Sequence, residues 1–317
     1  MVIACPHYEE AAPRGAASLR RVLLGIALSL VLVDAAWVFA AHLRIDWPGY
    51  LNLLLLSSMM LAASEIYRRK RPDPRLSAML FGAGFLCLFS TAASVLNYCL
   101  LTVAGASIDP QLAAIDRALG FDWPALMSAV APHPILNLVL QVAYISMLPQ
   151  VALLTIAVGR RKTYLDIYRF CMAVAVGALV CIGVWTLAPS FGAITVYAPP
   201  SNMPLVLDPA YARKLVALLA HGPGVISAAD TKGLIGFPSY HAVLALLVMF
   251  YGWKISWLRW PAVVLNLLVL VATPIQGGHH LVDVLGGVAV TALALGMAHA
   301  LEMPRKIGWH VARGSAG

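Results

Sequence analysis

Long runs of apolar residues, separated by short polar segments, dominate the sequence. Each run approaches the ~20 residues that cross the hydrocarbon core of a membrane as an α-helix. Eight such runs can be counted, at residues 22–42, 50–67, 77–103, 135–158, 170–188, 237–253, 260–276 and 280–301. The pattern therefore predicts an all-α, polytopic membrane helical bundle with about eight transmembrane helices, of which the sixth and seventh are short.

Composition supports a membrane protein built as one domain. The 317 residues are 61% hydrophobic and only 11% charged, whereas soluble domains have about 25% charged residues, so a soluble globular protein is excluded. No repeat of fixed period and no low-complexity linker divides the chain. We expect a cytoplasmic segment at 1–21, a transmembrane domain at 22–303 and a cytoplasmic tail at 304–317. The first residues lack a signal peptide's apolar core, so the first span should remain as an anchor.

The net charge of +8 is distributed in a way that orients the protein. If the chain starts inside and alternates, 17 of its 22 lysines and arginines fall on the inner side and 5 on the outer side. This positive-inside signal predicts a multi-pass plasma (inner) membrane protein with both termini cytoplasmic. The basic balance gives no reason to expect a nucleic acid partner. The five cysteines mostly fall within spans and predict neither a disulfide framework nor a metal site.

Two outer segments are long enough to form structure, and the first covers residues 104–134. Asp109 is expected to cap a helix, because it precedes a proline. Ile115 lies on the apolar face of the predicted helix and Asp116 on another face. A second short helix begins near Trp123, which we expect to anchor it in the interface. The segment therefore predicts two short interfacial helices.

The second outer segment, 189–236, is rich in proline and glycine. It carries the basic residues Arg213, Lys214 and Lys232 and leads directly into the string Phe-Pro-Ser-Tyr-His241. We therefore expect it to pack as a lid over whatever site that string forms.

Two polar clusters stand at the mouths of different spans, and the predicted topology places both on the outer side. One is Gly236-Phe-Pro-Ser-Tyr-His241 and the other is Gly277-Gly-His-His-Leu-Val-Asp283. Ionisable residues at membrane depth are costly and are candidates for function by default. Two such clusters at one membrane face predict a reaction centre.

The first cluster has the features of a phosphate-binding helix start. Pro238 suits a first helical turn, because its missing N–H would be unpaired there. Ser239, Tyr240 and His241 would then lie in that turn, where free amides and the positive end of the helix dipole attract phosphate. His241 adds a group that can donate a proton near neutral pH.

The second cluster has the spacing of a nucleophile and its orienting group. His279 and Asp283 are four residues apart and share one face of a helix. Asp283 can accept from one ring nitrogen and leave the other free to attack. Gly287 lies one turn further along and would let a neighbouring helix approach closely. His280 is expected to be an interfacial histidine rather than a second nucleophile.

These strings resemble a known family. Phe-Pro-Ser-Tyr-His241 is similar to the Pro-Ser-Gly-His motif of the type 2 phosphatidic acid phosphatase superfamily, and Gly-His279-His-Leu-Val-Asp283 is similar to the end of its last motif. Ile115-Asp-Arg-Ala-Leu-Gly-Phe-Asp-Trp-Pro124 and Leu187-Ala-Pro-Ser-Phe-Gly192 resemble the inositol phosphorylceramide synthase-like (aureobasidin-target) branch. The resemblance covers residues 105–300 and implies a six-helix phosphatase-like core.

The resemblance also implies roles for the site residues. His279 would attack phosphorus and form a phosphohistidine, with Asp283 orienting it. His241 would protonate the leaving alkoxide, and Ser239 with nearby backbone amides would hold the phosphoryl oxygens. No metal and no other cofactor would be used.

The sequence departs from the family where phosphate is clamped. Tyr240 replaces the small glycine of the middle motif, and Thr273 stands where the family has an arginine. The lysine of the family's first motif is absent. Because phosphoryl transfer depends on charge stabilisation, Arg213 and Lys232 are the expected substitutes, and Tyr240 and Thr273 become candidate substrate-binding residues.

The sequence leads to an enzyme that acts on a membrane lipid phosphate or phosphodiester at the outer leaflet. Water would make it a lipid phosphatase, whereas an alcohol or lipid acceptor would make it a head-group transferase; the branch favours transfer of an inositol-phosphate-like group. A transporter with histidine-linked proton coupling stays open, and so does a metal-dependent hydrolase that uses the His-His-x-x-Asp string.

Three other polar residues within spans have less specific interpretations. Tyr144 and Gln150 of the fourth span are expected either to line a substrate groove or to form a buried hydrogen-bonded pair. Asp34 of the first span has no partner that the sequence identifies, and a packing or inner-interface position is expected for it.

Overall fold

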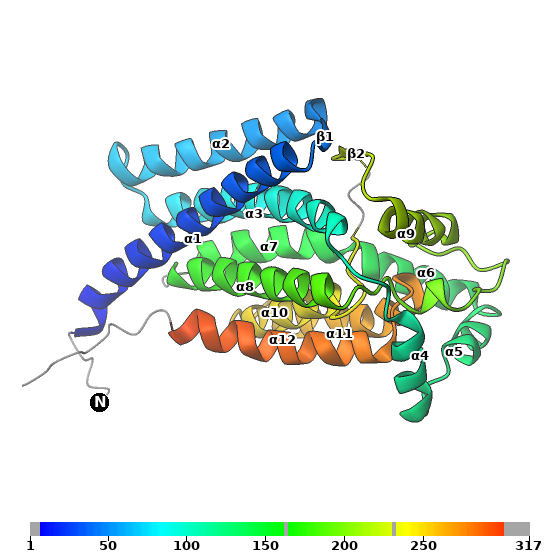
Figure 1. The fold of residues 1–317 in the computed structure, drawn as a ribbon. Helices are drawn as coiled ribbons and strands as arrows, with labels where there is room; N and C mark the ends of the chain where they lie inside the picture. Colours follow the sequence, from blue (N-terminus) through cyan, green and yellow to red (C-terminus); the bar gives the residue numbers. More distant parts are fainter. Residues whose placement is uncertain (1–6, 162–163, 230–232, 301–317) are drawn as a thin grey trace, which may run out of the picture.

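The computed structural model describes residues 7–161, 164–229 and 233–300. Within them the protein consists almost entirely of α-helices, which confirms the predicted all-α fold (Figure 1). The longer helices are α1 (His7–Ala40), α2 (Trp47–Arg69), α3 (Pro74–Cys99), α8 (Leu165–Leu187), α11 (Arg259–Gln276) and α12 (Leu281–Ala300). The shorter ones are α4 (Asp109–Ala118), α5 (Trp123–Val130), α6 (Pro134–Ile145), α7 (Met147–Gly159), α9 (Pro209–His221) and α10 (Tyr240–Trp253), with the 3-10 turns η1 (Leu100–Thr102) and η2 (Ala193–Thr195). Lys232 and the predicted tail at 304–317 lie outside the described residues.

Six of the eight predicted spans are present as long apolar helices. By length and composition the helices able to cross a membrane are Gly15–Ala40, Trp47–Arg69, Pro74–Thr102, Leu165–Leu187, Arg259–Gln276 and Leu281–Ala300. The number rises to seven if α5 and α6, which meet at 114°, make one bent span. The fourth and sixth predicted spans are represented by shorter apolar helices, α6 with α7 and α10.

The fourth predicted span, 135–158, is divided at Ser146 into α6 and α7. Pro149 lies in the first turn of α7, where it has no N–H to donate to the carbonyl of Ile145 and where its ring disfavours a continuous helix. The amide of Ser146 still bonds to Val142 O at 3.0 Å. The sequence therefore contains the cause of the break, Pro149, although counting apolar residues does not reveal it.

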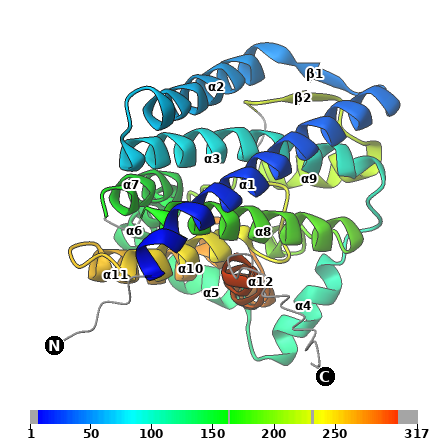
Figure 2. The same ribbon diagram turned by 90° about the vertical axis from the view of Figure 1, so that its left-hand side faces the viewer.

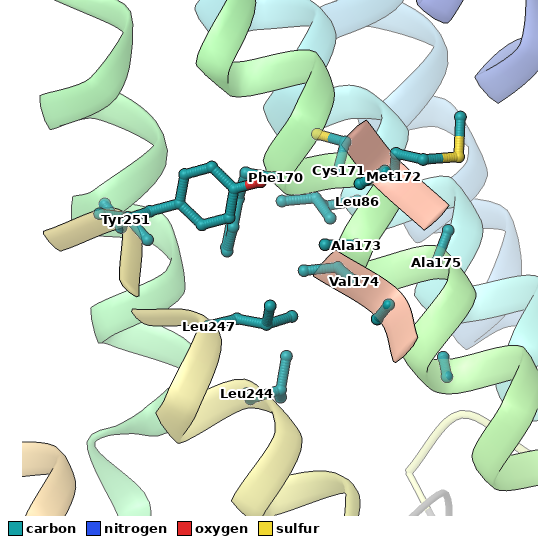
Figure 3. Close-up of a cluster of buried hydrophobic side chains, with 14 of the residues drawn as sticks. Leu86, Phe170, Cys171, Met172, Ala173, Val174, Ala175, Leu244, Leu247 and Tyr251 are labelled. Atoms are coloured by element: carbon teal, nitrogen blue, oxygen red, sulfur yellow. The ribbon is translucent and has the colours of Figure 1, made fainter. Parts of the chain in front are cut away.

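Helix α8 forms the centre of the bundle because it is apolar on all sides. Helices α1, α3, α10 and α12 pack against it, as Figures 1 and 2 show from two directions. Figure 3 shows part of this core, in which Phe170 of α8 lies with Leu247 and Tyr251 of α10. The rings of Phe170 and Tyr251 meet edge to face with centroids 5.4 Å apart. Within a bilayer such contacts stabilise mainly through close packing, since lipid tails are as apolar as the side chains.

Helices α1 and α2 form the outer layer. In the most apolar stretch of each helix, only 22% of the residues of α1 and 17% of those of α2 are buried inside the protein, against 61% for α8. Large apolar side chains project from them, and Leu28, Leu55 and Met59 are 61%, 61% and 70% exposed. An apolar surface of this kind is expected to face lipid.

The two ends of the bundle have different chemistry. At one end the buried carboxylate of Asp166 contacts Arg161, Arg169 and Lys254. The opposite end carries α4, α5, α9 and the parallel pair of strands β1 (Arg44–Asp46) and β2 (Val225–Ser227) (Figure 1). Helices α10 and α12 both begin there. The basic residues around Asp166 and the two histidine strings therefore lie at opposite ends of the helical bundle, as the predicted topology requires.

The predicted role of Trp123 is wrong. Trp123 is only 2% exposed and donates from Nε1 to Pro274 O at 2.8 Å, so it packs inside the protein rather than anchoring in the interface. Asp116 and Ile115 of α4 lie on different faces, as predicted, since Asp116 is 3% exposed and Ile115 is 45% exposed. Asp116 faces inward because its carboxylate accepts hydrogen bonds from the amides of Leu281 and Val282 at the start of α12.

The arrangement predicts the labelling of engineered cysteines from opposite sides of the membrane. In a variant without its native cysteines, Ser201→Cys at the histidine end should react with a membrane-impermeant maleimide in intact cells. Arg71→Cys at the basic end should react only after permeabilisation. Reaction of both positions from one side would contradict the topology.

Candidate active site

The nucleophile pair predicted from the sequence is formed at the start of α12. His279 Nδ1 lies 3.1 Å from Asp283 Oδ2 and 3.1 Å from Gly236 O. Both partners are acceptors, so Nδ1 carries the proton and Nε2 has the lone pair. Asp283 is fully buried and His279 is only 5% exposed, which limits the ring to one orientation.

Asp283 also determines how α12 begins. Its Oδ2 accepts from the amide of His280 at 2.9 Å, the reciprocal half of a capping box, in which an acidic residue in the first turn bonds the amide just before the helix. Its backbone oxygen accepts from the amide of Ser239 at 2.9 Å. One residue thus orients the histidine, caps its helix and ties it to the start of α10.

His241 lies in the first turn of α10 and is half-buried. Its ring stacks on Tyr144 of α6, with centroids 4.3 Å apart and an interplanar angle of 13°. The Tyr144 hydroxyl is 3.4 Å from His241 Nδ1. Tyr144 does not pair with Gln150, whose side chain instead bonds to Ser146 and Asn266, so the predicted Tyr144–Gln150 pair is wrong.

Gly277 lies between the hydroxyl of Tyr144 and the ring of His279. A Cβ atom built on Gly277 would lie 2.5 Å from the Tyr144 hydroxyl and 2.8 Å from Cδ2 of His279. Tyr144, which holds His241, therefore touches the same residue as the His279 ring. The absence of a side chain at Gly277 is what permits this approach.

Glycines also allow the surrounding segments to meet, and the predicted close approach at Gly287 is confirmed. A Cβ there would lie 2.7 Å from both Ala242 Cβ and Ser239 O, at the crossing of α12 with α10. Gly278 adopts a φ of +63°, which favours glycine, and its oxygen accepts from the amide of Ile194. Gly236 N donates to Ser190 O at 2.6 Å. The two ends of the segment 189–236 thus pack over the cluster, as predicted for a lid.

The candidate phosphate-binding residues differ in whether they lie beside the histidines. Ser239 is the N-cap of α10, accepts from Ala242 N at 3.4 Å and is fully buried beside the histidines. Pro238 consequently precedes the cap instead of forming the first helical turn. Tyr240 points away, since its hydroxyl lies 3.3 Å from Val174 O of α8.

Thr273 is buried in α11 and donates its hydroxyl hydrogen to Val269 O at 2.8 Å. In this arrangement neither Thr273 nor Tyr240 presents a free donor to the histidines. Ser239 is therefore the one of these three candidates that the fold places at the cluster.

Arg213 lies on α9 and lines a cavity of about 270 Å³ together with Ile194, Thr195 and Tyr197. Arg117 donates to the hydroxyl of Tyr197 on the same cavity. Ile194 contacts Gly278, so only the turn η2 separates these two cations from the His279 loop.

A further cluster, which was not predicted from the sequence, holds α4 and the lid (the segment 189–236) against α12. It consists of Asp109, Asp116 and His280 and is called the acidic cluster below. The carboxylate of Asp109 accepts from Phe191 N, Gly192 N and the hydroxyls of Ser190, Thr195 and Ser107. Asp109 therefore does not cap its own helix. Four of these five donors belong to the loop at 190–195, so Asp109 attaches α4 to that loop.

His280 lies between Asp109 and Asp116 and is completely buried, so the prediction of an interfacial histidine is wrong. Its Nδ1 is 3.3 Å from Asp116 Oδ2 and its Nε2 is 3.5 Å from Asp109 Oδ1. Burial alone would lower the pKa of His280, but the bond to Asp109 and the negative charges of Asp283, Asp109 and Asp116 raise it above its usual value. Burial opposes ionisation of Asp109, yet hydrogen bonds from His280, Ser107, Phe191 and Ser190 hold the pKa of Asp109 below its usual value.

The described side chains of the acidic cluster are not arranged as a metal site. Within residues 7–161, 164–229 and 233–300, no group of three or more His, Cys, Asp or Glu side chains is placed to hold a metal ion.

Comparison with known proteins connects this geometry to a family. The family model described as PAP2 superfamily matches residues 110–297, more than half of the chain. The chain belongs to the PAP2 superfamily. The match includes His241, His279 and Asp283, and membership supports a phosphatase-type lipid enzyme in a membrane. No curated protein and no solved structure matches the chain.

The acidic cluster predicts a sharp difference between two aspartates. Asp109→Asn replaces one of two buried acceptor oxygens with an NH2 group that would face other donors, and it should lower the free energy of unfolding by about 3 kcal/mol. Asp122 is the matched control, because it is exposed and caps α5 by accepting from Ala125 N. Asparagine caps helices as well as aspartate does, so Asp122→Asn should change stability by less than about 0.5 kcal/mol.

Unfolding of the two variants in detergent, followed by tryptophan fluorescence, measures the difference. If the two variants were equally stable, the hydrogen bonds of Asp109 would not be what holds the lid against α4.

Proposed function

We propose that the protein is a lipid phosphatase or phosphotransferase that works through a phosphohistidine. The observation that carries the proposal is the hydrogen bonding of His279. Its Nδ1 proton is held by Asp283 and Gly236, so the lone pair on Nε2 is the one that can attack phosphorus.

The proposed reaction has two steps. In the first, Nε2 of His279 bonds to phosphorus while the bond from phosphorus to the lipid oxygen breaks, and His241 gives that oxygen a proton. In the second, water or an alcohol attacks the phosphohistidine, His241 takes its proton, and His279 leaves. Asp283 stabilises the positive ring that His279 becomes.

Tyr144 is proposed as a positioning residue for His241. Its ring stacks on the imidazole and its hydroxyl faces Nδ1, which directs Nε2 of His241 away from the tyrosine. The contact of Tyr144 with Gly277 supports a placement of the proton donor beside the attacking ring.

The phosphate would be held by Ser239, by the first amides of α10 and by outer cations. The start of a helix offers unpaired N–H groups and a positive dipole end. Arg213, Arg117 and Lys232 are the proposed replacements for the family's missing clamp. Arg213 lines the cavity beside η2, and Arg117 bonds to Tyr197 of that cavity. Tyr240 and Thr273 would act on the packing of α10 and α11 rather than on the phosphate.

We further propose the inositol phosphorylceramide synthase-like branch, and therefore transfer of a head group to a lipid acceptor at the outer face of the plasma membrane. The strings 115–124 and 187–192 support this branch. They contribute to the acidic cluster, because Asp116 lies in the first and Phe191 and Gly192 lie in the second.

The two rival functions have less support. A proton-coupled transporter would need its ionisable groups near the membrane midplane, whereas His241 and His279 lie at the ends of α10 and α12. A metal-dependent hydrolase would need His280 as a ligand, but its ring is enclosed by Asp109 and Asp116.

Substitution of the histidines tests the mechanism. With a phosphorus-labelled lipid phosphate, His279→Ala should abolish both turnover and the labelled covalent intermediate. His241→Ala should lose about 10²–10⁴-fold with the lipid and much less with a nitrophenyl ester, whose leaving group needs no proton. Asp283→Asn should lose activity on the scale of about 10⁴-fold seen for that change in serine triads.

His299→Ala is the matched control, because His299 is exposed, bonds to Leu295 O within α12 and lies at the other end of that helix from His279. Its activity should equal that of the unchanged protein. A fully active His279→Ala variant, or activity that EDTA removes and zinc restores, would exclude the phosphohistidine.

The fate of the intermediate separates the two products. If the protein is a transferase, adding a long-chain or polyol alcohol should convert label from free phosphate into the phosphate monoester of that alcohol, in proportion to alcohol concentration. Chromatography of the labelled products measures the ratio. Free phosphate alone at every alcohol concentration would restrict the function to hydrolysis.

A further inference from the structure

A cavity away from the histidines lies among α1, α2 and α3. Its volume is about 520 Å³, and most of its lining is aliphatic or aromatic, including Val31, Val38 and Leu54. Its polar side chains include Asp34 of α1 and Tyr50 of α2, together with the exposed His42 and with Thr91 of α3. None of the proposed catalytic residues contributes to it.

Asp34 and Tyr50 are buried without hydrogen-bond partners. They are 7% and 4% exposed, and neither Asp34 Oδ1 nor the Tyr50 hydroxyl is bonded within the part of the chain that the structure describes. No ion pair reaches Asp34 among those residues. An unbonded carboxyl or hydroxyl in an apolar environment is costly, so a purely structural role for the pair would be unfavourable.

Several polar groups of the same helices are satisfied. Ser57 of α2 donates to Leu53 O, and Thr91 of α3 donates to Cys87 O, whereas Asn97 Nδ2 of α3 is buried without a partner among the described residues. The buried carboxylate Asp166, unlike Asp34, has three cationic partners. Asp34 and Tyr50 are two unpartnered groups on the wall of one cavity, and this pairing points to a group that the protein binds.

The cavity lies at the histidine end, at the level of one membrane leaflet. Asp34 precedes the end of α1 at Ala40 by six residues, which is about 9 Å along a helix. Tyr50 packs in one cluster with Phe191 and Leu234, which belong to the segments around His279. Since α1 and α2 are the helices with the largest lipid-facing surface, a membrane amphiphile can enter without crossing the aqueous phase.

We propose that this cavity binds an amphiphile with an aliphatic chain and a free hydroxyl group. The chain would occupy the apolar part, and the hydroxyl would bond to Asp34 and Tyr50. A hydroxyl both donates and accepts, so it can accept the phenol hydrogen of Tyr50 and donate to the carboxyl of Asp34. An ammonium group only donates and would leave the Tyr50 hydrogen without an acceptor.

Photolabelling of the purified full-length protein tests the site. The probe is a long-chain primary alcohol with a diazirine in the chain and a terminal alkyne, and labelled peptides are identified by mass spectrometry. Label should appear in α1, α2 and α3, and unlabelled long-chain alcohol should compete for it. The corresponding alkane and primary amine should compete poorly.

Two variants examine the polar pair. Tyr50→Phe and Asp34→Leu should each weaken competition by the alcohol about five- to tenfold, the range for a lost hydrogen bond. Tyr98→Phe is the matched control, because Tyr98 is a buried phenol of the same cluster that contacts Tyr211 and does not line the cavity. Its labelling should not change.

Stability gives an independent readout. Without alcohol, Asp34→Leu should unfold at a higher temperature than the unchanged protein, because it removes an unpaired buried carboxyl. Equal labelling by alcohol and alkane probes, or unchanged competition in both variants, would overturn the proposal. Competition by the amine but not by the alcohol would overturn it in favour of a cation site. Labelling is read without turnover, so its result is independent of the phosphohistidine mechanism.

Discussion

The arrangement at the histidine end depends on the carboxylate of Asp283. It bonds to the ring of His279 and to the amide of His280, while its backbone oxygen accepts from Ser239. These three bonds set the ring orientation, the start of α12 and the spacing between α12 and α10. Because the group is completely buried, its bonds are not weakened by competing water. Removal of the carboxylate would break the first two bonds together and leave only the backbone bond from Ser239.

A second constraint on this end of the bundle comes from glycines that are combined with buried acidic side chains. Gly236, Gly277, Gly278 and Gly287 let backbones and rings approach closer than side chains would allow. Close backbones bring unpaired amides into an apolar interior, where they need acceptors. Asp109 supplies one for the loop at 190–195. The same carboxylate contacts His280, so the lid and the start of α12 share one electrostatic network.

The sequence predicted those parts of the molecule that rest on local spacing. The pairing of His279 with Asp283 follows from a separation of four residues, and the helical bundle follows from the apolar runs. The close approach at Gly287 was predictable for the same reason. Such features need no knowledge of how distant segments meet.

Features that depend on distant segments were missed or misread. The stacking of Tyr144 on His241 joins residues 97 positions apart, and no local pattern contains it. Trp123 matched the pattern of an interfacial residue, yet a carbonyl at Pro274, 151 positions away, accepts its N–H inside the protein. Asp109 was predicted to cap its helix and no partner was predicted for Asp116, because their partners come from the lid and from α12. Tertiary hydrogen bonds decided these positions, against the local preference.

The break between α6 and α7 has a mechanical consequence. Pro149 leaves the carbonyl of Ile145 without the amide that would continue the helix across Ser146. Tyr144 is therefore the penultimate residue of α6, immediately before the break. Helix α6 packs against α11, whereas α7 packs between α3 and α10. The support of the His241 ring therefore depends on the packing of α6 against α11 and not on that of α7.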